Sequence, residues 1–208
     1  MKNILIHGLG QNNRDWDTIK TVLEARGISS IAPDLFDLAK GRKLDYPTVY
    51  QAFSELCESY QDKLNLCGLS LGGLLALNYA IQYPKKINSL VLIGTPFEIP
   101  KGLLKFQNIV FRFMPKAVFQ NMGVSKKDFI RLSKSMVDLN FMDSATALDC
   151  PALILCGAKD KTNMESAKRF HEAMKNSKLV IVEASGHEVN KDNPRKLVSI
   201  LQDFWVDN

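Results

Sequence analysis

The chain has 208 residues, a length that suits one domain with a sizeable core. Its composition, 46% hydrophobic and 24% charged, is ordinary for a globular protein, and no apolar stretch approaches the ~18 residues of a membrane span. The net charge of +5 comes without a nucleic-acid recognition motif, so we expect no nucleic-acid partner. The N-terminus lacks the features of a signal peptide and the four cysteines form no Cys-x-x-Cys pair, so we expect a cytoplasmic protein with free thiols.

Short apolar runs alternate with helical patterns along most of the chain. We expect six strands, at roughly 2–6, 28–32, 63–67, 87–93, 152–156 and 178–182. Helical spacing follows at 15–26, 48–60, 74–84, 163–175 and 194–205, whereas residues 35–45 show no period and are expected to be loop. Because the strands are apolar on both faces, the pattern predicts an α/β fold with a mostly parallel sheet covered on both sides.

The alternation is interrupted at residues 97–148, where helix-like patterns of high apolar and aromatic density take over. We expect a core formed by 1–96 and 149–208, with 97–148 inserted as a small helical cap over the carboxyl edge of the sheet. The alternative is a helical pair that fills out the core. Eight basic and four acidic residues leave this segment with +4 of the net charge, which indicates a solvated surface or a preference for anionic substrates. The candidate pocket residues in the cap are Phe97, Phe106, Phe113 and Met114.

The stretch CGLSLGG at residues 67–73 lies between an apolar run and a buried helical pattern. A serine between glycines on a strand-to-helix turn is the pattern of a nucleophile elbow. The strained serine requires small residues two positions to either side, because side chains there would collide across the turn. The following helix directs its positive end at an anion formed at this point. The pattern therefore predicts that Ser70 is a nucleophile, the alternative being an accidental turn.

A serine hydroxyl needs a base to remove its proton and a third group to orient that base. His187 is the candidate base, because it follows the last predicted strand at the edge where Ser70 emerges. Asp160 follows the strand at 152–156 and is the candidate acid, and the order Ser70, Asp160, His187 is the expected one. Glu98, after the fourth strand, is the rival acid.

Two further backbone amides and two further histidines complete the candidate residues. Stabilisation of an oxyanion at this kind of elbow uses the amide after the nucleophile, Leu71, and one from the turn after the first strand, Leu9. His7, directly before that turn, is expected to brace neighbouring loops. His171 lies within a predicted helix and is expected to be structural or exposed.

Taken together, these motifs resemble those of the α/β-hydrolase superfamily. The matching elements, in the family's order, are HGLGQNNRDW, Pro33-Asp34-Leu35, GLSLGG, GAKDKT and SGHEVNKDNP. The resemblance implies a three-layer fold whose family core has eight strands. Because this chain begins at the strand before HGLG, we expect six strands without the family's first two, as in small lipases. The short cap makes compact, esterase-like serine hydrolases the most similar members.

The leading hypothesis is a serine hydrolase that cleaves a carboxylic ester or thioester of a small to medium acyl group through an acyl-enzyme on Ser70. The alternative is that the same three side chains act as a base system for carbon–carbon cleavage or elimination on a small anionic substrate. A third hypothesis, disfavoured by the intact constellation, is a non-catalytic binding member of the fold. No cofactor, metal or stable membrane insertion is expected, and the oligomeric state is left open.

Overall fold

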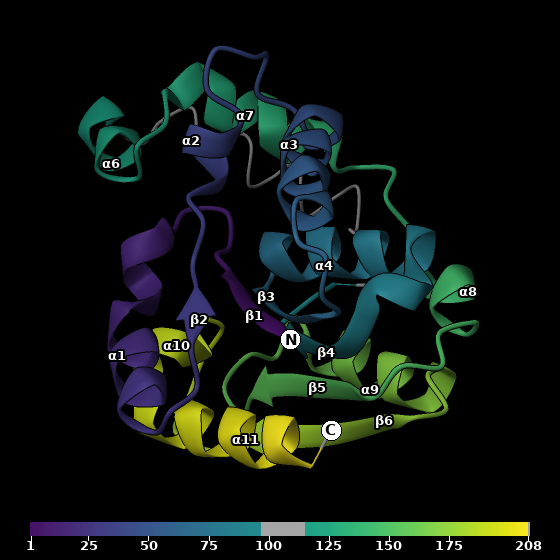
Figure 1. The fold of residues 1–208 in the computed structure, drawn as a ribbon. Coiled ribbons are helices and arrows are strands. Elements are labelled where there is room, and N and C mark those ends of the chain that lie inside the picture. Colours follow the sequence, from purple (N-terminus) through teal and green to yellow (C-terminus); the bar gives the residue numbers. More distant parts are fainter. Residues whose placement is uncertain (97–114, 208) are drawn as a thin grey trace.

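The computed structural model describes residues 1–96 and 115–207 and contains one six-stranded sheet (Figure 1). Every neighbouring pair of strands is parallel, in the order β2-β1-β3-β4-β5-β6. The strands are β1 (Lys2–Ile6), β2 (Ser30–Ile31), β3 (Leu64–Leu69), β4 (Ile87–Ile93), β5 (Ala152–Gly157) and β6 (Ser177–Val182). The six strands and the parallel α/β architecture predicted from the sequence are therefore confirmed.

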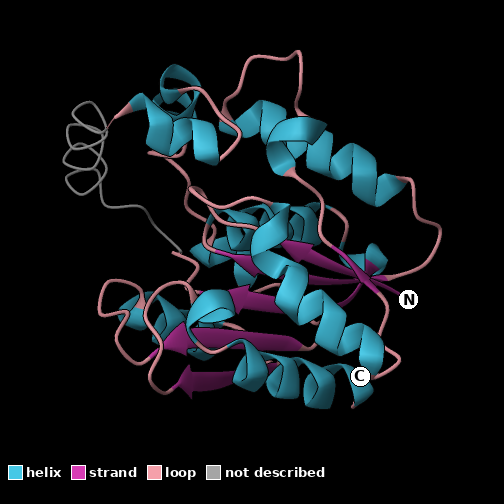
Figure 2. Ribbon diagram, turned by 90° about the vertical axis from the view of Figure 1, so that its left-hand side faces the viewer, coloured by secondary structure: helices cyan, strands magenta, loops and turns pink. Residues whose placement is uncertain are grey.

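Helices cover both faces of the sheet, and Figure 2 shows the strands between two helical layers. On one face, α1 and α11 pack over the sheet, and on the other α3, α4 and α9 do so. The helices are η1 (Asn13–Trp16), α1 (Asp17–Ala25), α2 (Leu35–Leu38), α3 (Tyr46–Glu58), α4 (Leu71–Gln82), η2 (Pro84–Lys86), α6 (Lys116–Asn121), α7 (Lys126–Ser135), α8 (Met142–Ala145), α9 (Met164–Ala173), α10 (Val189–Asp192) and α11 (Pro194–Val206).

Successive strand residues point to opposite faces and join different cores. In β1, Ile4 and Ile6 join the core under α3 and α4, whereas Leu5 joins the core under α1 and α11. In β4, Leu92 and Ile93 divide in the same way. Because both faces of the central strands are buried, β1, β3, β4 and β5 are mostly apolar, which is why they could be recognised in the sequence.

The strand order reverses between β1 and β3. From β1 the chain crosses outward through α1 to β2, and from β2 it returns through α3 to β3 on the opposite face of the sheet. Right-handed crossovers in opposite directions leave a crevice at the carboxyl ends of the two central strands, the usual ligand position in open α/β sheets. The turn at residues 7–12 and the Ser70 turn both leave the sheet at this point.

The structure differs from the sequence-based expectations in two places. The segment at 35–45, expected to be loop, contains α2, which begins where the Asp34 carboxylate accepts hydrogen bonds from the Phe36 and Asp37 amides. A single turn stabilised by its cap is too short to show a period. The second strand is also shorter than predicted, at two residues.

Part of the predicted cap can be described. Within residues 115–148 the chain forms α6, α7 and α8, and Phe119, Phe129 and Leu132 join the core beneath α3 and α4. The insertion of 97–148 as a cap stays a prediction. No helix within residues 1–96 and 115–207 has the length and apolar character required to cross a bilayer.

Candidate active site

Ser70 lies on the turn between β3 and α4 and is the N-cap residue of α4. Its φ of 53° and ψ of −111° place it in a region that non-glycine residues rarely adopt. The Ser70 amide donates to the Ile93 carbonyl at 2.9 Å, which ties the turn to the end of β4. Such a conformation is strained by about 1–3 kcal/mol and persists only when surrounding structure holds it.

The glycines on either side of Ser70 have the steric role predicted for them. A β-carbon at Gly68 would collide with the Gly72 carbonyl, and one at Gly72 would collide with the Ile6 and His7 carbonyls. The first turn of α4 therefore lies directly against the ends of β1 and β3. Larger residues at these two positions would push the helix away and open the turn.

Asp160 and His187 meet beyond the ends of β5 and β6, although 27 residues separate them in the sequence. Asp160 Oδ2 lies 2.7 Å from His187 Nδ1. The Asp160 side chain is 5% exposed and the His187 side chain 41% exposed, so a buried carboxylate holds a ring that reaches solvent. The structure thus brings together the predicted acid and the predicted base.

Asn163 supports the same carboxylate. Its Nδ2 donates to both Asp160 oxygens, at 3.0 and 2.9 Å, and its backbone amide donates to Oδ1 at 3.2 Å. Burial alone would raise the Asp160 pKa, but the hydrogen bonds from His187 and Asn163 and the charge of His187 lower it below 3.8 overall. Sequence reasoning missed Asn163, whose only signal was its position three residues after the candidate acid.

The contacts of the carboxylate determine the tautomer of His187. Asn163 Nδ2 also lies 3.2 Å from His187 Nδ1. This amide nitrogen can only donate, and Nδ1 lies nearer to the Asp160 carboxylate, at 2.7 Å. An ionised Asp160 can only accept, so the proton belongs on Nδ1 and points at Oδ2. The lone pair of His187 then resides on Nε2, on the side of the ring away from Asp160.

Residues Ile93 and Gly94 lie between Ser70 and the Asp160–His187 pair. Ile93 accepts the Ser70 amide, and a β-carbon at Gly94 would lie 3.0 Å from His187 Nδ1. Ser70 and His187 therefore flank the same two backbone positions at the end of β4. Within the part of the chain that the structure describes, no hydrogen bond joins the Ser70 hydroxyl to His187. Such bonds are often long before a substrate binds.

Both predicted oxyanion donors flank the Ser70 turn. Leu71 is the first residue of α4, so its amide belongs to the orphan donors of a helix start. Leu9 follows Gly8, whose β-carbon, if present, would lie 3.5 Å from Ser70 Cβ. Neither amide donates to another residue of the described ranges 1–96 and 115–207. Their role as oxyanion donors stays a prediction.

His7 braces two loops, as expected from its sequence position. Its ring is fully buried, Nδ1 lies 3.0 Å from the Gly8 carbonyl, and Nε2 accepts from the Leu35 amide at 3.0 Å. Burial lowers its pKa below 6.5, outweighing the Gly8 hydrogen bond and two aspartates that raise it. His171 is exposed on α9 and contacts Ser177, also as expected.

Several sequence-derived candidates lie outside the described residues, namely Glu98, Phe97, Phe106, Phe113 and Met114. Among residues 115–148, Met122 approaches the site. A β-carbon at Gly10 would lie 3.8 Å from Met122 Cε, so this methionine lies beside the turn that carries Leu9. The sequence contains no signal that would single Met122 out from the other apolar residues of 97–148.

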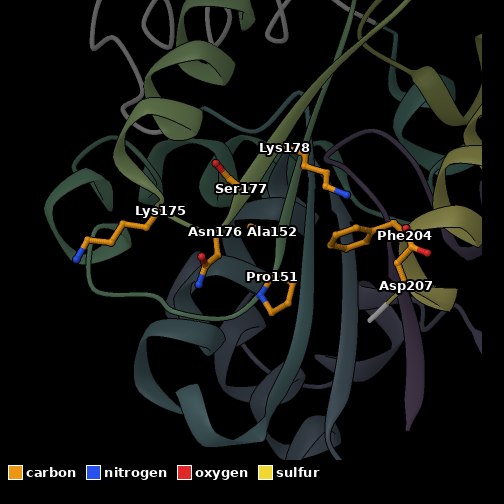
Figure 3. Close-up of a pocket in the computed structure, with 8 residues that line it drawn as sticks. All are labelled: Pro151, Ala152, Lys175, Asn176, Ser177, Lys178, Phe204 and Asp207. Atoms are coloured by element: carbon orange, nitrogen blue, oxygen red, sulfur yellow. The ribbon is translucent and has the colours of Figure 1, made fainter.

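A cavity of about 420 Å³ lies elsewhere, at the amino ends of β5 and β6 (Figure 3). Its lining includes Pro151, Asn176 and Phe204. Asp160 and His187 follow the opposite ends of the same strands, so this cavity is separate from the candidate site. Among residues 1–96 and 115–207, no cluster of three or more His, Cys, Asp or Glu side chains is suited to a metal ion.

The chain is similar to known proteins in both sequence and fold. A sequence model of the α/β hydrolase fold matches residues 4–139. The chain is 27% identical to lipase 3 of Moraxella sp., over 88% of this chain and 70% of the lipase. It is 22% identical to the pimeloyl-[acyl-carrier protein] methyl ester esterase of Aeromonas hydrophila, over 97% of this chain and 94% of that esterase. In fold, it resembles a thermophilic esterase from Thermogutta terrifontis, with a TM-score of 0.82, 18% identity, and coverage of 100% and 90%.

Proposed function

The chain belongs to the α/β-hydrolase fold family, and from that premise we propose that it hydrolyses carboxylic esters or thioesters of small to medium acyl groups. The observation that carries the proposal is the strained Ser70, which lies at the sheet edge where Asp160 holds His187 at 2.7 Å. A binding protein would have no use for such a strained serine beside a buried acid–base pair. Ester hydrolysis is also the activity named for the Moraxella and Aeromonas relatives.

In the proposed first half-reaction, His187 Nε2 takes the proton of the Ser70 hydroxyl as Oγ attacks the acyl carbon. The resulting imidazolium donates from Nδ1 to Asp160, whose lowered pKa keeps it ionised near neutral pH. The carbonyl π bond opens and its electrons move to the oxygen, which accepts from the Leu9 and Leu71 amides. Each such donor contributes on the order of 10²–10³ in rate.

The tetrahedral intermediate then collapses. The bond to the leaving alcohol or thiol breaks, His187 Nε2 returns its proton to that leaving group, and the acyl group stays on Ser70 Oγ. Water enters, loses a proton to Nε2 and attacks the acyl carbon. The bond between the acyl carbon and Oγ then breaks, Nε2 returns its proton to Oγ, and release of the carboxylic acid leaves the Ser70 hydroxyl restored. The reaction needs no metal or redox cofactor.

The acyl group is proposed to lie against the turn that carries Leu9 and against the cap. Met122 beside Gly10 supports an apolar wall on that side. The four cap residues named from the sequence remain proposals for the rest of the pocket.

A fluorophosphonate probe and a series of nitrophenyl esters test this proposal directly. We expect wild type and the Ser133→Ala variant, which changes a buried serine of α7, to be labelled and to turn over esters. Ser70→Ala should do neither. An unlabelled wild type without Ser70-dependent ester or thioester turnover would overturn the proposal. Turnover of a cyclic carboxylate without a trapped acyl-enzyme would indicate the alternative base system instead.

A further inference from the structure

A buried polar network joins the turn after β1 to the loop after β6. Gln11 and Asn190 are 1% and 2% exposed, and their side-chain amides face each other. Gln11 Nε2 donates to Asn190 Oδ1 at 3.1 Å and to Glu188 Oε1 at 2.9 Å. Asn190 Nδ2 in turn donates to the Asp15 carbonyl at 3.2 Å. These contacts connect segments that lie 175–179 residues apart in the sequence.

A second, more exposed contact joins the same two loops. Lys191 Nζ lies 3.0 Å from Asp15 Oδ1 and 3.2 Å from Glu188 Oε1, with the lysine side chain 40% exposed. Ion pairs open to water hold geometry weakly. The buried Gln11 amide therefore provides the stiffer connection, because its donors have no water to replace a lost partner.

Gln11 is placed to connect two functional positions without touching either. It lies two residues after Leu9 in one turn, closed by a hydrogen bond from the Gln11 amide to the Gly8 carbonyl at 3.2 Å. Its partner Glu188 directly follows His187. The side chain thus spans from the turn that offers the Leu9 amide to the loop that carries the ring.

We propose that Gln11 is a positioning residue, whose side-chain amide holds the Leu9 turn at a fixed distance from His187. This inference rests on the proposed function, since it assigns Gln11 to the alignment of the base with the oxyanion donor. A bound acyl group must contact both at once. An error of ~1 Å in such an alignment can lower turnover on the order of 10²-fold.

A glutamine suits this position because it combines reach with two N–H donors. Gln11→Met keeps length and burial but removes the donor to Asn190 Oδ1 and leaves Glu188 Oε1 with only the exposed Lys191 ammonium. Gln11→Glu places a second carboxylate against Glu188. The double variant Gln11→Glu/Glu188→Gln restores a donor–acceptor pair with the roles exchanged.

A buried amide at the other end of the sheet is the matched control. Asn65 is 3% exposed, donates to Asn3 Oδ1 at 2.8 Å and accepts from the Ser89 hydroxyl at 2.7 Å. It lies near the start of β3, far from the Ser70 turn. Asn65→Leu therefore removes a comparable buried network without touching the loops of the candidate site.

The test measures kcat and KM for nitrophenyl butyrate, the rate of fluorophosphonate labelling, and the thermal midpoint. We expect Gln11→Met to lower kcat and the labelling rate by about 10–100-fold with KM within about threefold. Asn65→Leu should lower the thermal midpoint comparably and leave kcat within about twofold, since it lies away from the reacting groups. Gln11→Glu should be impaired, and the double variant should recover at least about tenfold in kcat.

The outcomes separate the two proposals. If Gln11→Met keeps wild-type kcat, Gln11 is structural only and the inference is overturned. The same holds if Gln11→Met and Asn65→Leu both lose kcat in proportion to their loss of thermal stability. If wild type itself has no Ser70-dependent turnover, the proposed function fails and the role of Gln11 fails with it.

Discussion

Gly94 presents a bare α-carbon to the ring of His187. A β-carbon there would lie 3.0 Å from Nδ1 and 3.1 Å from Cε1 of the histidine, and 3.3 Å from Asp160 Oδ2. The φ of Gly94 is +51°, so the backbone also has a conformation that glycine adopts most readily. The end of β4 thus forms one wall of the aspartate–histidine pair.

Gly94→Ala is expected to displace this ring by a few tenths of an ångström and to lower kcat by about tenfold or more. Steady-state ester hydrolysis measures the effect. Gly27→Ala is the matched control, because Gly27 has a φ of +78° with no atom within 4 Å of the added β-carbon. Both variants should lose about 1 kcal/mol of stability from backbone strain. Equal kcat in the two variants would show that the contact with His187 is unimportant.

Asp160→Asn is expected to lower kcat by about 10³–10⁴-fold, because an amide no longer selects the Nδ1–H tautomer. Ester turnover and circular dichroism together measure this loss in a folded protein. Asp149→Asn makes the same charge change at an exposed position and should retain wild-type kcat. An Asp160→Asn variant with near-normal turnover would move the role of the acid to another residue, Glu98 being the rival.

His7→Gln is expected to change how stability depends on pH. The folded pKa of His7 lies below 6.5, so the unfolded chain binds more protons between that lowered pKa and 6.5. The contribution of neutral His7 to the free energy of unfolding is therefore fully present above pH 6.5. It falls as the pH drops, by at most about 1.4 kcal/mol per pH unit. Urea unfolding at pH 7, 6 and 5 should show a shallower decline for His7→Gln. His171→Gln, at an exposed position, is the control for removing a histidine. If the free energy of unfolding of His7→Gln depends on pH as steeply as that of wild type, His7 is not the source of the decline.

Leu9→Ala is expected to change acyl preference more than transition-state stabilisation, because the backbone amide survives the substitution. The rate of labelling by a small phosphonate should stay within about threefold of wild type, far from the 10²–10³ expected for a lost donor. The preferred ester chain length should shift toward longer acyl groups, as space opens beside Met122. A lower labelling rate without a change in the preferred acyl chain length would contradict this separation of the roles of the Leu9 side chain and the Leu9 amide.

The sequence alone determined the strand–helix alternation and the position of the elbow. Strands buried on both faces are apolar at most positions, so β3 and β4 are visible as short apolar runs in spite of Asn65 and Ser89. The elbow is local in part, because a side chain at Gly68 would collide with Gly72, within a few residues of Ser70. A side chain at Gly72 would instead collide with the carbonyls of Ile6 and His7, which the fold brings there from the end of β1. The single turn of α2 was missed, since its capping by Asp34 is too short a signal to produce a period.

The tertiary structure alone decided which distant groups meet at the sheet edge. The pairing of Asp160 with His187, the wall formed by Gly94 and the amide pair of Gln11 and Asn190 all depend on strand order and loop direction. Strand order depends on how whole helices pack on the sheet, so it cannot be recognised in any single segment of the sequence. Polar residues in loops have no periodicity either. The sequence could therefore identify Asp160 and His187 as candidates by their positions, but it could not predict the side chains and backbone that contact them.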